Sequence, residues 1–95
     1  MKNLIITPEI ELKLFEKHGV RRIDVVECFH NRNAKYLEDN RVNNKTNPPT
    51  LWFIAETHKG ILLKIVAVFN EGKIYLKTAY QPNEIEIHIY KKYAY

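Results

Sequence analysis

Three strand-like segments joined by two short turns constrain the fold of this chain of 95 residues more than any other feature. The segments cover residues 50–57, 61–69 and 73–81, and each is rich in the β-branched and aromatic residues that favour strands. His58-Lys59-Gly60 and Asn70-Glu71-Gly72 separate them, and short connectors that contain glycine are typical of β-hairpins. The pattern therefore predicts an antiparallel meander.

The last of these segments alternates between apolar and polar positions, as expected of a strand with one buried face. The expected apolar face carries Ile74, Leu76 and Thr78. The opposite face of the strand, which is expected to be solvent-exposed, carries Tyr75, Lys77 and Ala79. Residues 36–39 suit a short edge strand, so the predicted sheet has three or four antiparallel strands.

Two helices are predicted before the meander. Thr7-Pro8-Glu9 supplies an N-cap hydroxyl, a proline at the first helical position and an acid near the positive end of the helix dipole. Gly19 stands where a left-handed residue can end this helix. Its expected buried residues are Ile10, Leu14 and Phe15.

A second helix is predicted over residues 21–30, because polar residues recur with a period of three and strict alternation is absent. Its β-branched residues would also suit a strand. The expected inner side carries Ile23, Val26 and Phe29, with Val25 and Cys28 beside them. Residues 40–49 are polar and predict an exposed loop, and Pro82-Asn83-Glu84 predicts a short closing helix.

These elements make one α+β domain over residues 1–95, with two N-terminal helices, the meander and a short C-terminal helix. The composition, 45% hydrophobic and 27% charged, is that of a globular protein with one core. Lys64 interrupts the longest apolar run, residues 61–69, which is far shorter than a membrane span. The N-terminus lacks the pattern of a secretory signal, so we expect a cytoplasmic protein without a membrane partner.

Short motifs across the chain resemble the BrnT branch of the RelE/ParE toxin superfamily. Lys17-His18-Gly19-Val20 is similar to the segment that joins the first two helices of that family. Lys77-Thr78-Ala79-Tyr80 is similar to the end of its last strand, with Tyr80 in place of an arginine. Glu86-Ile87-His88-Ile89-Tyr90 is similar to its closing helix, with His88 at a basic position.

The resemblance implies a RelE-like fold and a metal-independent endoribonuclease that an antitoxin protein neutralises. It also implies RNA as the partner, with or without the ribosome. A formal charge of +4 and a pI near 9.2 independently favour a polyanionic partner. The rival interpretation is a non-catalytic protein-interaction domain or an inactive relative of the toxins.

The chain also resembles short bacterial proteins labelled ADP-ribosyl-(dinitrogen reductase) hydrolase. Enzymes with that activity resemble large helical domains with a two-metal carboxylate site, which a chain of 95 residues with a central sheet is too small to form. We therefore disfavour this alternative.

When a 2′-hydroxyl of the RNA attacks the adjacent phosphorus, cleavage needs a base for the hydroxyl proton, an acid for the leaving oxygen and positive charge near the phosphorus. We predict that His88 is the acid or base and that Lys64 and Lys77 stabilise charge. Tyr80 would stack on a base or orient the phosphate. Glu56 and His58, at the end of the first meander strand, are further candidates. Each residue also has a structural alternative: Lys64 must be solvated or paired, because an unpaired buried ammonium is costly.

Aromatic and basic residues interleave over the C-terminal quarter of the chain, a pattern typical of surfaces where unpaired bases stack and lysines hold phosphates. The predicted RNA-binding residues are Lys73, Tyr75, Tyr90, Lys91 and Lys92.

No pair of His, Cys or carboxylate residues has zinc spacing and no glycine-rich phosphate loop occurs, so no metal or cofactor is expected. The sequence contains no serine, which excludes serine hydrolase chemistry. The single cysteine, Cys28, is expected to be a buried helix residue.

Overall fold

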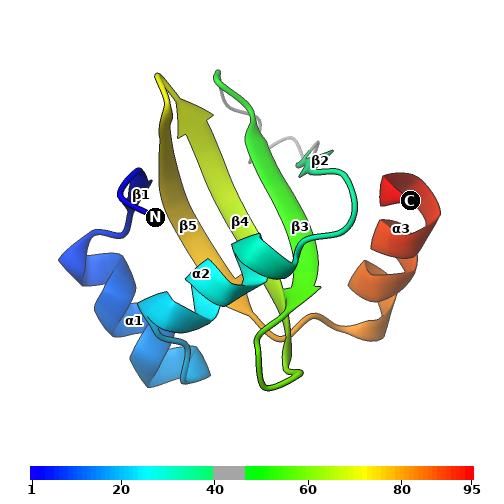
Figure 1. Cartoon of the computed structure of the whole chain (residues 1–95), viewed down its shortest axis with the longest axis horizontal. Coiled ribbons are helices and arrows are strands. Elements are labelled where there is room, and N and C mark those ends of the chain that lie inside the picture. The colour runs from blue at the N-terminus through cyan, green and yellow to red at the C-terminus, as the bar shows by residue number, and fades with distance from the viewer. Residues whose placement is uncertain (40–46) are drawn as a thin grey trace.

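The computed structural model describes residues 1–39 and 47–95, and over these residues it has three helices and a five-stranded sheet (Figure 1). The helices are α1 (Pro8–His18), α2 (Arg22–Asn31) and α3 (Glu84–Ala94). The strands are β1 (Leu4–Ile5), β2 (Leu37–Glu38), β3 (Thr50–Glu56), β4 (Leu62–Asn70) and β5 (Lys73–Tyr80). The α+β class and the predicted order of helices, meander and closing helix are confirmed. Residues 40–46 of the predicted loop lie outside the described residues.

The sheet is mixed, in the order β1-β5-β4-β3-β2. Strands β2 to β5 pair antiparallel as predicted, whereas β1 runs parallel to β5, with Leu4 opposite Ile74. The backbone N–H of Ile74 donates to the carbonyl of Asn3 over 2.8 Å. The prediction of three or four purely antiparallel strands was therefore wrong by one short strand. A two-residue strand is too short for periodicity to reveal it.

An extra residue in β5 changes the alternation predicted for that strand. Val66 of β4 pairs with Thr78, but the next residue, Ala67, pairs with Leu76, so Lys77 is the bulged residue. Beyond this bulge Ala79, rather than Thr78, is fully buried. Tyr80 comes directly opposite Lys64.

The ends of α1 follow the predicted signals. The side chain of Thr7 accepts a hydrogen bond from the backbone of Ile10, and Gly19 closes the helix with a φ of 64°. The predicted buried residues need two corrections, because Phe15 of α1 and Ile23 of α2 are 50% and 57% exposed. The periodicity located the helices correctly but placed their buried faces slightly off, since the packing angle against the sheet decides which residues contact it.

The helices lie on both faces of the sheet. Phe53 and Trp52 are neighbours on β3 and therefore point to opposite faces. Phe29 of α2 packs on Phe53 with ring centroids 4.8 Å apart, and Tyr90 of α3 packs on Trp52 at 5.6 Å. Figure 1 shows α1 and α2 across one face and α3 beyond β3, near the other end of the sheet from α1. The largest fully buried side chains are those of Phe53, Ile65, Leu76, Val25 and Cys28.

No helix in the described part of the chain combines the length and the apolar character that a membrane crossing requires.

Candidate functional site

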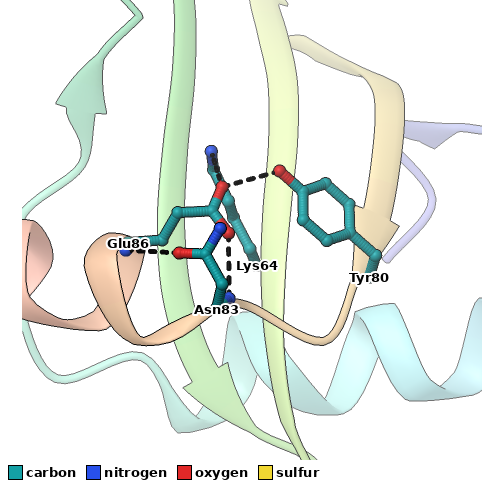
Figure 2. A network of polar contacts seen from close by, with 4 residues as sticks. All are labelled: Lys64, Tyr80, Asn83 and Glu86. Carbon is teal, nitrogen blue, oxygen red and sulfur yellow. Dashed lines mark hydrogen bonds and ion pairs between the residues drawn. The ribbon is translucent and has the colours of Figure 1, made fainter.

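A buried lysine forms the centre of a polar cluster between the sheet and α3 (Figure 2). Lys64 of β4 is 7% exposed, and its Nζ lies 2.7 Å from Oε2 of Glu86. The hydroxyl of Tyr80 donates to the same carboxylate oxygen, also over 2.7 Å. The lysine nitrogen also lies 4.5 Å from the centre of the Trp52 ring, within cation–π range. The structure thus brings two of the predicted catalytic residues, Lys64 and Tyr80, to one place.

The first turn of α3 holds Glu86 in position for this contact. The backbone N–H of Glu86 donates to Oδ1 of Asn83 over 2.8 Å, and Oε1 of Glu86 accepts from the backbone of Asn83 over 3.0 Å. These reciprocal bonds form a capping box, which also satisfies two N–H groups at the helix start. Both oxygens of Glu86 therefore have partners, as the dashed lines in Figure 2 show.

The protonation states of the cluster follow from its neighbours. Burial alone would raise the pKa of Glu86, but hydrogen bonds from Lys64, Asn83 and Tyr80 outweigh it, and the pKa is lowered. Burial and the hydrogen bond to Glu86 raise the pKa of Tyr80 above its ordinary value of 10. At neutral pH the carboxylate of Glu86 is therefore ionised and the phenol of Tyr80 is protonated. This arrangement neutralises Lys64 and attaches α3 to the sheet.

The other two predicted catalytic residues lie elsewhere. Lys77 is exposed and lines a small cavity of about 140 Å³ together with Lys13, Lys17 and His18 of α1. His88 is exposed on α3, two residues beyond Glu86 and so about 200° around the helix from it. A single catalytic site made of Lys64, Lys77 and His88 would require these side chains to lie together, so this prediction needs correction. The bulge at Lys77 and the rotation of α3 separate the three side chains.

The predicted RNA-binding residues also separate. Tyr90 is 3% exposed, packs on Trp52 and donates its hydroxyl to the carbonyl of Lys35 over 2.9 Å, so it is a core residue instead of a stacking surface. Burial, with the nearby Tyr95, raises its pKa. Lys73 and Tyr75 are exposed on β5.

Lys91 and Lys92 are exposed at the end of α3, next to Tyr93 and Tyr95 in the sequence. Tyr93 is 60% exposed and Tyr95 is 74% exposed. The Lys92 nitrogen lies 5.4 Å from the centre of the Tyr93 ring. We call these four residues, Lys91, Lys92, Tyr93 and Tyr95, the C-terminal surface.

A cavity of about 320 Å³ adjoins the C-terminal surface, and we call it the C-terminal cavity. Its apolar lining is Ile54, Ala55, Leu62 and Ile87. Its polar and aromatic lining is Asn31, Asn33, Glu56, Lys91, Tyr90 and Tyr95. It lies where the ends of α2 and β3 meet the start of β4 and the inner side of α3. The sequence did not indicate this cavity, because its residues come from four separate segments.

Hydrogen bonds connect the cavity to the β3–β4 turn. The side-chain nitrogen of Asn31 donates to the carbonyl of Glu56 over 2.9 Å and lies 3.1 Å from Nδ1 of His58. The backbone N–H of His58 donates to a carboxylate oxygen of Glu27 over 2.9 Å. The two further candidates from the sequence, Glu56 and His58, are therefore adjacent to this cavity.

The state of the single cysteine and the grouping of metal-ligating side chains bear on nucleophilic and metal chemistry. Burial, followed by the charges of Asp24 and Glu27, raises the pKa of Cys28 to about 12, so this thiol stays protonated. Over residues 1–39 and 47–95, no three His, Cys, Asp or Glu side chains are grouped so that they could hold a metal ion.

Neither a protein-family model nor a curated protein matches this chain.

Proposed function

We propose that this protein is a toxin-like RNA-binding protein that holds single-stranded RNA on the C-terminal surface. One observation carries the proposal: two exposed tyrosine rings and two exposed lysines lie within five residues at the end of one helix. Every base has a face that can stack on such a ring, and the lysines suit the neighbouring phosphates. The net positive charge of the chain would assist the approach of RNA.

The proposal assigns no cleavage role to the Lys64 cluster. The ammonium of Lys64 is paired with Glu86, and the Tyr80 hydroxyl donates to the same oxygen. Either group would have to leave its partner in a mostly buried site before contacting a phosphate, which is unfavourable. The metal-independent ribonuclease activity and the antitoxin partner remain implications of the resemblance to the BrnT branch.

Fluorescence anisotropy with a short labelled single-stranded RNA at about 0.15 M salt tests the proposal, since exposed charges are screened there and stacking dominates. Replacing Tyr93 and Tyr95 by alanine should weaken binding about tenfold or more, because stacking contributes roughly 1–3 kcal/mol per base. Replacing Lys91 and Lys92 by alanine should also weaken RNA binding, and this loss of affinity should be larger at low salt than at high salt.

The matched control is the double variant Lys13→Ala with Lys17→Ala, which removes the same charge from α1. These lysines share a cavity with Lys77 on the other basic region of the molecule. We expect less than about a twofold change from this control. A larger loss from the α1 variant than from the tyrosine variant would contradict the proposed surface.

A non-catalytic protein-interaction domain is the second candidate, and one observation favours it. Ile85 and Ile89 are 71% and 38% exposed, and with Tyr93 they form a row of apolar side chains one turn apart on α3. Such a row suits a hydrophobic groove on a partner protein. Under this alternative, the native protein would not bind RNA but would bind an antitoxin protein of the kind that the resemblance implies. The double variant Ile85→Lys with Ile89→Lys would abolish that binding.

A further inference from the structure

The C-terminal cavity has the size of a site for one small ligand group. Its volume of about 320 Å³ lies at the low end of the range for ligand pockets, roughly 300–1,000 Å³. Its lining combines apolar side chains with a few polar groups, a composition that suits a pocket for a flat ring with a polar edge. A single nucleoside therefore fits the cavity, whereas a base pair does not.

The aromatic lining suits a flat ring. The rings of Tyr90 and Tyr95 lie 6.0 Å apart between centroids and at 83° to each other. Tyr90 is buried and belongs to the wall, while Tyr95 is 74% exposed and keeps most of its surface free. A base that enters the cavity can stack on Tyr95 and meet the edge of Tyr90.

The carboxylate of Glu56 in the cavity lining would favour a base with hydrogen-bond donors on its edge. Glu56 is exposed, and no other described residue forms a hydrogen bond or ion pair with its carboxylate. An ionised carboxylate only accepts hydrogen bonds, and it repels RNA phosphates unless donors of the RNA compensate. Guanine presents two adjacent donors, N1–H and the N2 amino group, on its Watson–Crick edge. Each of the other bases places an acceptor beside its donor there.

Lys91 completes the site. It lines the same cavity as Glu56 and belongs to the C-terminal surface, so its ammonium can hold the phosphate attached to an inserted nucleoside. Asn31 borders Glu56, and its contacts with the Glu56 carbonyl and the His58 ring set the orientation of its amide.

We infer that the C-terminal cavity binds one unpaired guanine nucleotide of the RNA, with Glu56 accepting from the base edge, Tyr95 stacking on its face and Lys91 holding the phosphate. This inference rests on the proposed function and adds the identity of the recognised base to it.

The test compares labelled uridine-rich RNAs that carry one central guanosine, adenosine, cytidine or inosine. The native protein should bind the guanosine RNA about tenfold more tightly than the adenosine RNA, as expected of a bidentate contact. Inosine lacks the N2 amino group and should fall between the two. Glu56→Gln should remove most of the preference, because the amide presents a donor beside its acceptor.

The matched control is Glu84→Gln, which removes an exposed acid of α3 that does not line the cavity and should leave the preference unchanged. Equal binding of all four RNAs would overturn the guanine inference but leave the proposed function intact. Failure to bind any of them would refute the proposed function. In that case, titration with guanosine 5′-monophosphate tests whether the cavity binds a guanine nucleotide independently of RNA. The absence of chemical-shift changes in its lining residues would overturn the inference as well.

Discussion

Helix α3 contributes residues to two groups of polar side chains, and the surroundings of these groups differ. Towards the sheet, Glu86 is paired with Lys64 and Tyr80. At the other end of the helix, Lys91 and Tyr95 are exposed beside a cavity. Both groups contain a lysine, a tyrosine and an acid, since Glu56 borders the cavity. The comparison shows that residue type does not distinguish a structural cluster from a binding surface. What distinguishes them is whether the polar atoms already have hydrogen-bond or ion-pair partners within the protein.

The largest effect should come from breaking the buried pair. Lys64→Ala leaves the carboxylate of Glu86 without its cation, and the side chains of the pair are only 9% and 17% exposed. We expect a loss of about 3 kcal/mol in the free energy of unfolding, near the lower end for a broken buried pair. Urea denaturation measures it.

Lys91→Ala is the matched control for that experiment, because it removes an exposed lysine from α3, the helix that carries Glu86. It should change the free energy of unfolding by less than about 0.5 kcal/mol. A similar loss in both variants would mean that the two regions do not differ in the way described.

A pH titration of stability should sharpen the comparison with a smaller effect. The folded-state pKa of Glu86 is below its ordinary value of 4.5, so the ionised carboxylate stabilises the fold fully above about pH 4.5. This contribution should be lost as the pH falls from there through the folded-state pKa, when Lys64 loses its partner. Urea midpoints measured across this range should fall less steeply for Glu86→Gln than for the native chain. Parallel curves for the two proteins would contradict the assigned shift.

The smallest of these effects should come from the cap that orients Glu86. Asn83→Ala removes the acceptor for the backbone N–H of Glu86 and should cost about 1 kcal/mol. Asn83→Asp keeps an acceptor at the helix N-terminus and should retain most of the stability. If alanine and aspartate destabilise the protein equally in thermal melts, the cap does not hold the cluster together.

Local signals predicted most of the fold. Thr7 and Gly19 marked both ends of α1, and the glycine-containing turns located the three long strands to within about a residue. The site could be predicted only in part. The cost of a buried ammonium required Lys64 to be either solvated or paired, and the structure shows that it is paired with Glu86. The Asn83-x-x-Glu86 spacing of a capping box is a local signal that could have placed Glu86 at the start of α3.

The sequence by itself determined the helices, the three long strands and the requirement that Lys64 be solvated or paired, because these depend on interactions within a few residues or on burial alone. Only the tertiary structure decided which side chains meet. The bulge at Lys77 placed Tyr80 opposite Lys64, and the rotation of α3 directed Glu86 inward while His88 stayed exposed. The C-terminal cavity likewise exists only where four separate segments come together. A shift of one residue in a strand, or of about 100° on a helix, moves a side chain to another surface, and local patterns do not specify such shifts.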